Sequence, residues 1–130
     1  MKHATGTFNV KLDPQEDSDI SDPTIFRMSI DKKFEGDIEG TSLGQMLATR
    51  TEIEGSAGYV AIEKVRGTVH GSSGTFALQH SSTMTRGEPQ QSILVVPDSG
   101  TDELLGLTGT FRIIIKDGQH FYEFDYSLPE

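Results

Sequence analysis

One histidine and one glutamate have the residue types and the surroundings for acid–base chemistry. His80 lies in GTFALQHSSTM (74–84), among alternating apolar and small polar residues, and Glu63 lies in a similar run at 58–70. A carboxylate and an imidazole that meet in an enclosed place shift each other's proton affinity, and general acid–base pairs arise in this way. Such a pair can equally bind a ligand, or hydrogen-bond internally and specify a core. All three interpretations stay open for Glu63 and His80.

The acidic segment DPQEDSDISDP, residues 13–23, suggests a calcium loop, but its spacing does not fit. Counting from Asp17, the sixth position is Asp22 where a calcium loop has glycine, and the twelfth is Met28 where it has glutamate. We therefore expect a solvated, mobile acidic loop at about 13–23.

Other catalytic and metal-binding motifs are absent from the sequence. The segment GSSG, residues 71–74, lacks the lysine of a phosphate loop and the Gly-x-Ser-x-Gly spacing of a serine nucleophile. The four histidines, at positions 3, 70, 80 and 120, have no zinc-ligand spacing, and the chain has no cysteine. The sequence predicts no metal site and no cofactor.

The elements that must position these residues are strands. Fourteen glycines separate runs in which apolar and polar residues alternate with period two. Only the segment Thr101 to Leu107 suggests a helical turn. The chain is long enough for one domain, residues 1–130, and eight strands on short turns favour a closed antiparallel β-barrel or a sandwich. The predicted strands are 4–12, 24–35, 41–53, 58–70, 75–85, 90–97, 107–116 and 119–128.

The dipeptide Asp117-Gly118 predicts a two-residue hairpin turn, because both of its positions need positive φ. Pairing Lys116 with Gln119 fixes the register of the hairpin. One face is then apolar and aromatic, and it carries the pairs Ile115 with His120, Ile113 with Tyr122, Phe111 with Phe124 and Gly109 with Tyr126.

A second hairpin joins the strands that carry Glu63 and His80. If the four residues 71–74 form the connection, Val65 lies opposite His80 and Glu63 lies opposite Ser82. Glu63 is then diagonal to His80, within reach of a long side chain.

The enclosed face combines these polar residues with many aromatic ones, which predicts binding of a small apolar or amphipathic molecule in the barrel interior or mouth. The alternatives are an isomerase or cyclase acting on such a ligand, with Glu63 and His80 as candidate catalytic residues, and a solid-cored structural or interaction protein. The candidate ligand-binding residues are Met28, Glu63, Phe76, His80, Phe111, Tyr122 and Tyr126.

Charge and composition limit the partners. Twenty acidic and eleven basic residues give a formal charge of -9, which disfavours nucleic acid and anionic lipid. No apolar run approaches the ~20 residues of a membrane helix, and the start MKHATGTF has no signal-peptide pattern. With no cysteine, we expect a cytoplasmic protein. A homodimer is possible on general grounds.

The chain resembles a bacterial family known only as a domain of unknown function, whose members are similar to allene oxide cyclase in having an eight-stranded barrel. The resemblance covers nearly the whole chain and implies a barrel, but no established activity. Allene oxide cyclases bind a fatty-acid epoxide in an apolar barrel, and none of their ligand-binding residues can be matched here. Where the family often has glycine after His-Ser, this chain has Ser82. The motifs are ATGTF (4–8), FEGDIEGTSLGQM (34–46), GSAGYVAIEKVRGTV (55–69), GTFALQH (74–80), VVPDSGT (95–101), LTGTF (107–111) and GQHFYEFDYSLP (118–129).

Overall fold

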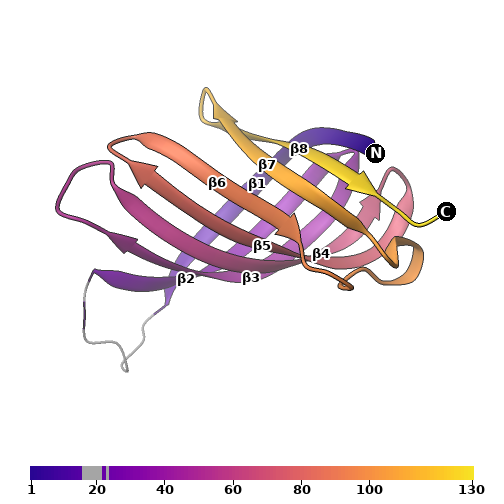
Figure 1. Ribbon diagram of the computed structural model, residues 1–130, viewed down its shortest axis with the longest axis horizontal. Coiled ribbons are helices and arrows are strands. Elements are labelled where there is room, and N and C mark those ends of the chain that lie inside the picture. Colours follow the sequence, from indigo (N-terminus) through magenta and orange to yellow (C-terminus); the bar gives the residue numbers. More distant parts are fainter. Residues whose placement is uncertain (16–21, 23) are drawn as a thin grey trace.

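Eight strands form one closed antiparallel barrel, as the sequence predicts (Figure 1). The computed structural model describes residues 1–15, 22 and 24–130. Each strand pairs with the next in the chain, and the last pairs with the first. The strands are β1 (Lys2–Gln15), β2 (Ile25–Gly36), β3 (Ile38–Arg50), β4 (Ala57–Val69), β5 (Ser72–Thr85), β6 (Glu88–Val95), β7 (Thr108–Lys116) and β8 (Gln119–Ser127).

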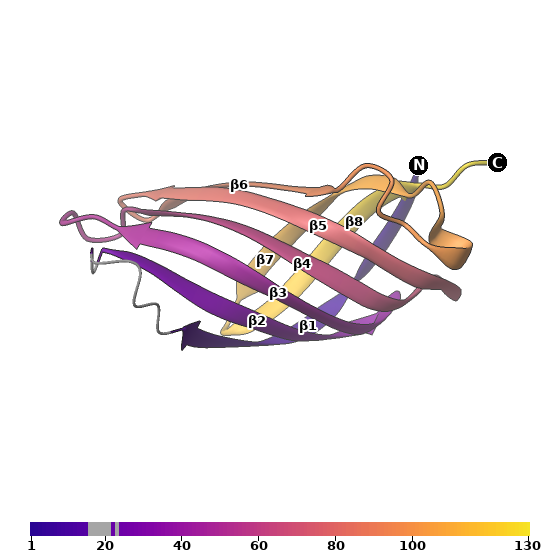
Figure 2. The same ribbon diagram turned by 90° about the horizontal axis from the view of Figure 1, so that it is seen from below.

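The strands differ in length, and this gives the barrel two unlike halves. The strands β1 to β5 have 12 to 14 residues, whereas β6 to β8 have eight or nine. Figure 2 shows β7 and β8 crossing β3 to β5 at an angle on the opposite wall. Both termini lie at one end of the barrel, and the turns β3–β4 and β5–β6 lie at the other. We call the half of the barrel that contains the termini the closed half, and the half that contains the β3–β4 and β5–β6 turns the open half.

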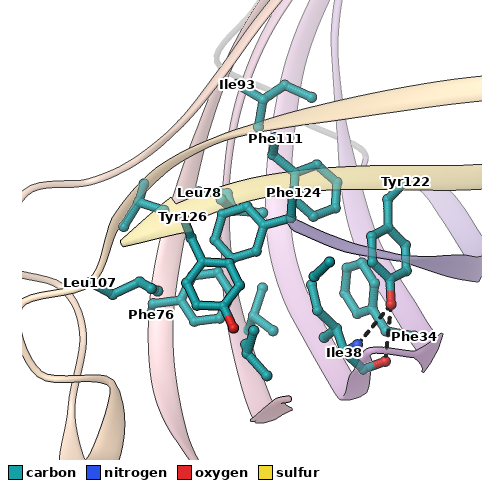
Figure 3. Packing of buried hydrophobic residues seen from close by; sticks show 14 of the residues in the cluster. Phe34, Ile38, Phe76, Leu78, Ile93, Leu107, Phe111, Tyr122, Phe124 and Tyr126 are labelled. Atoms are coloured by element: carbon teal, nitrogen blue, oxygen red, sulfur yellow. Dashed lines mark hydrogen bonds between the residues drawn. The ribbon is translucent and has the colours of Figure 1, made fainter. Parts of the chain in front are cut away.

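Aromatic side chains fill the closed half (Figure 3). Phe124 is fully buried, and its ring stacks on those of Phe76 and Tyr126, with centroids 5.7 and 5.1 Å apart. Phe111 stacks on Tyr122 at 5.5 Å. An eight-stranded barrel is just wide enough for such side chains to fill it, and these rings occupy the interior of this half.

A short helix closes the same end. The 3₁₀ turn η1 (Asp102–Leu104) lies within the segment predicted to form a helical turn, and it buries Leu104 completely. Leu107, just after it, is also buried and packs in the same cluster. Among the described residues, no helix is long and apolar enough to cross a membrane.

The β7–β8 hairpin has the predicted turn and register. Asp117 and Gly118 have φ of 53° and 76°, and Lys116 pairs with Gln119. The outer face carries the ion pair between Arg112 and Glu123. A two-residue turn fixes the register of both strands, which is why the pattern was sufficient here.

The predicted register of the β4–β5 hairpin is wrong. The turn is His70-Gly71, with φ of 47° and 82°, so Val69 pairs with Ser72 and β5 begins before Gly74. His80 therefore lies opposite Ala61, not Val65, and Glu63 lies opposite Leu78, not Ser82. The observed pairing differs from the predicted one by four residues, as from Val65 to Ala61 opposite His80. Because four is an even number, every side chain stays on its predicted face.

Several strand ends also differ from the prediction. β3 begins at Ile38 instead of residue 41 and ends at Arg50 instead of residue 53. β1 continues through Gln15, so residues 13–15 of the predicted acidic loop belong to a strand. Asp22 accepts hydrogen bonds from Thr24, and residues 16–21 and 23 of that loop lie outside the described residues.

The barrel closes through a narrow seam. In the described chain, Leu94 and Thr110 form the one backbone pair between β6 and β7. The side chain of Gln91 extends the contact, because its Oε1 accepts a hydrogen bond from the Ile113 N–H at 2.9 Å. The wall therefore has fewer backbone pairs between β6 and β7 than between any other neighbouring strands of the described chain.

Candidate functional site

Glu63 and His80 are in contact inside the barrel. His80 Nε2 lies 2.6 Å from Glu63 Oε2, and the two residues are 3% and 0% exposed. The same carboxylate oxygen accepts a hydrogen bond from Lys32 Nζ at 2.7 Å, and Oε1 accepts one from Ser42 Oγ at 2.8 Å. The predicted pair is therefore part of a buried cluster of four polar side chains.

Four adjacent strands position this cluster, one residue from each of β2, β3, β4 and β5. Lys32 pairs with Ser42 across β2 and β3, and Glu63 is diagonal to His80 across β4 and β5. Gly44 lies opposite Glu63, where a Cβ atom would come within 2.7 Å of the Glu63 Cα. Glycine at this position lets the two strands approach closely.

The charges of the cluster favour an ionised glutamate. Burial raises the pKa of Glu63, but the hydrogen bond with His80 and the nearby Lys32 ammonium outweigh it and lower the pKa from 4.5 to about 2. The Lys32 ammonium also lies 4.8 Å from the centre of the Phe8 ring, a favourable cation–π distance. Lys32 and Glu63 thus form a buried pair whose charges cancel.

The lowered pKa predicts a specific loss of stability in acid. Below about pH 4.5 the unfolded chain binds a proton at Glu63 that the folded chain does not bind until about pH 2. The stability that ionised Glu63 contributes is therefore present above pH 4.5 and is lost as the pH falls toward 2, by on the order of 3 kcal/mol. Urea unfolding at several pH values should show the free-energy gap between wild type and Glu63→Gln narrowing over this interval; a constant gap would contradict the assignment.

One atom of the cluster has no partner. Among the described residues, Nδ1 of His80 is the one buried side-chain nitrogen or oxygen atom without a hydrogen bond to another protein group. Leaving such an atom unpaired costs about 1–3 kcal/mol. Unsatisfied buried groups in native proteins are therefore candidates for a functional contact.

His80 forms part of the wall of a cavity in the open half. The cavity has a volume of about 280 Å³, and Lys32 and Ala61 also line it. An adjoining hollow of about 300 Å³ at the barrel mouth shares Leu12, Met46 and Tyr59 with it. The remaining residues around the cavity are Phe8, Val10, Ile30, Ile113, Ile115 and His120.

The other predicted ligand-binding residues divide between the two halves. Met28 lines the hollow at the mouth. Phe76, Phe111, Tyr122 and Tyr126 lie in the closed half, each at most 4% exposed, and they do not line the cavity. The Tyr122 hydroxyl accepts a hydrogen bond from the Ile38 N–H at 2.8 Å (Figure 3). It also donates a hydrogen bond to the Glu35 carbonyl at 3.1 Å.

Lys32 and Ser42 are the members of the cluster that sequence reasoning missed. The period-two pattern of β2 does carry a signal, because Ile30 and Phe34 face inward and Lys32 lies between them. Ser42 pairs with Lys32 and so shares its face. Among the described residues, no group of three or more His, Cys, Asp or Glu side chains is placed to hold a metal ion.

Comparisons with known proteins agree on the fold and leave the activity open. The family model described as "Protein of unknown function (DUF3224)" matches residues 4–126. A crystal structure of a protein with unknown function from that family, from Shewanella oneidensis MR-1, has 45% sequence identity and a TM-score of 0.94. The match covers 100% of this chain and 98% of that chain. No curated protein matches this chain.

Proposed function

The chain belongs to the DUF3224 family, whose function is unknown, and from this premise we propose that it binds a small, largely apolar molecule in the open half of its barrel. The observation that carries the proposal is the cavity of about 280 Å³ beside the buried cluster of Lys32, Glu63 and His80. Apolar cavities with a few converging polar groups are the usual form of small-molecule sites.

The size and chemistry of the space support this function. Ligand pockets commonly have about 300–1,000 Å³, a range that the cavity and its adjoining hollow reach together. Apart from Met1, the chain has three methionines, Met28, Met46 and Met84, and all three line the hollow. Flexible thioethers adapt to apolar ligands of different shapes.

The alternatives predicted from the sequence have different consequences. A structural or interaction protein with a solid core would have side chains throughout the barrel interior. Buried aromatic side chains occupy the closed half, whereas the open half contains the cavity. Turnover of the bound molecule would require, in addition, that Glu63→Gln or His80→Gln abolish product formation while binding persists. The cytoplasmic location stays a prediction.

Filling the cavity should abolish binding. Ala61 is 5% exposed and faces the cavity, so Ala61→Phe would place a ring in the space that the ligand needs. We expect the variant to bind N-phenylnaphthylamine, an uncharged apolar dye, at least about tenfold more weakly than wild type, as measured by fluorescence titration.

The control is the neighbouring residue on the outer face. Val60 is 53% exposed, and Val60→Phe adds a ring to the same strand without changing the cavity. Binding should persist in this variant. Equal affinity in all three proteins would place the dye elsewhere and overturn the proposal. Native mass spectrometry of freshly purified wild type then reads the mass of any molecule that the cavity carries.

A further inference from the structure

The unpaired Nδ1 of His80 restricts the chemical group that the ligand can present, which the shape of the cavity does not. The residue is 3% exposed, and it lines the cavity. An apolar molecule alone would leave Nδ1 without a partner and would not recover the cost of its burial. This inference rests on the proposed function, because it asks which chemical group the bound molecule presents to His80.

The neighbours of His80 determine which kind of hydrogen bond Nδ1 can make. Nε2 lies 2.6 Å from the ionised Glu63 carboxylate, which can only accept, so Nε2 carries a proton. Lys32 already balances the charge of Glu63, and a second cation would leave a net positive charge inside an apolar barrel. The arrangement in which the charges of the cluster balance has a neutral imidazole with its proton on Nε2, and in this tautomer Nδ1 is an acceptor.

We propose that the ligand is an uncharged alcohol or phenol whose hydroxyl group donates a hydrogen bond to Nδ1 of His80. Ethers and ketones have no proton to donate, and a carboxylate would need a protonated imidazole beside Lys32. An ammonium group would be repelled by the Lys32 side chain, which lines the same cavity. The apolar remainder of the molecule lies against Val10, Ile30 and Met46.

Two isomeric probes test the assignment. n-Octanol and heptyl methyl ether have the same atoms, but only the alcohol can donate a hydrogen bond. Displacement of N-phenylnaphthylamine from wild type should show n-octanol binding about tenfold more tightly than the ether, and more tightly than octanoate. In His80→Phe the preference for the alcohol should vanish while both probes still bind.

A second measurement keeps the test decisive if His80→Phe does not fold. Nitrogen NMR of wild type should show His80 protonated on Nε2 only, and n-octanol should move the Nδ1 signal while the ether does not. A histidine protonated on both nitrogens would overturn the proposal. So would loss of the alcohol preference in His120→Phe instead of His80→Phe, because the hydroxyl would then pair with the other histidine of the cavity wall.

The outcomes separate this inference from the function on which it rests. If the alcohol and the ether bind wild type equally, the cavity binds apolar molecules and the hydroxyl assignment is wrong. If octanoate binds most tightly, the ligand is an anion. If no probe displaces the dye and the dye itself does not bind, the proposed function fails together with the assignment.

Discussion

Replacing Glu63 with glutamine should lower the free energy of unfolding by about 3–5 kcal/mol at neutral pH. The carboxylate accepts hydrogen bonds from Lys32, Ser42 and His80, and the residue is completely buried. Glutamine preserves the volume but removes the only negative charge that the buried Lys32 contacts among the described residues. The destabilisation comes mainly from this uncompensated ammonium, and urea unfolding measures it.

Two further variants identify the cause. Adding Lys32→Met to Glu63→Gln removes the unpaired charge, so the double variant should recover most of the lost stability. Glu123→Gln breaks the ion pair with Arg112, whose side chain is 65% exposed, and should cost at most about 1 kcal/mol. If the double variant is no more stable than Glu63→Gln alone, the cost lies in lost hydrogen bonds and the charge argument is wrong.

The faces of the strands could be predicted from the sequence more reliably than their register. In the β4–β5 hairpin the predicted connection was too long, yet Glu63 and His80 remained inward and diagonal to each other. Alternation has period two, so an even displacement does not change it. The error arose at His70, where a non-glycine residue with a φ of 47° forms half of a two-residue turn. Both turns have glycine at the second position, Gly71 and Gly118, so the difference lies at the first, where aspartate is favoured in such turns and histidine is not.

The site was only partly predictable, for two physical reasons. Lys32 is a charged residue on an inward position, and charged side chains are almost never fully buried unless paired. Its contact with Glu63 depends on the registers of β2 with β3 and of β3 with β4, which alternation does not fix. The division into a closed and an open half depends on how far β1 to β5 extend beyond β7 and β8 and on which side chains fill the space. Neither the relative length of the strands nor the filling of the interior follows from the alternation of apolar and polar residues. That alternation predicts which residues face inward, but not the volume left between them.

The two halves of the barrel differ in what they contribute: the closed half contributes stability, and the open half contains the cavity. The closed half contains the stacked rings and the plug formed by η1, whereas the open half holds the cavity. The cluster around Glu63 lies between them and links four strands. A barrel arranged in this way can keep an apolar cavity because the closed half supplies the folding energy that the cavity does not.

This division predicts that Phe124→Ala should lower the free energy of unfolding by about 3–5 kcal/mol, the range for a fully buried phenylalanine. The Phe124 ring contacts those of Phe76, Phe111 and Tyr126, with centroids between 5.1 and 5.7 Å away. The walls around it are hydrogen-bonded strands, which cannot collapse into the space that the ring leaves. Urea unfolding with an unchanged m-value would attribute the loss to the folded state.

The matched substitution in the open half is Phe26→Ala. Phe26 lies at the barrel mouth, is only partly buried, and has the Arg50 guanidinium 5.2 Å from its ring centre. Its loss should cost about 1–2 kcal/mol, because solvent already reaches the ring and little new cavity is created. Equal costs at Phe26 and Phe124 would mean that both halves contribute alike to stability, and the open half could then no longer be regarded as space reserved for a ligand.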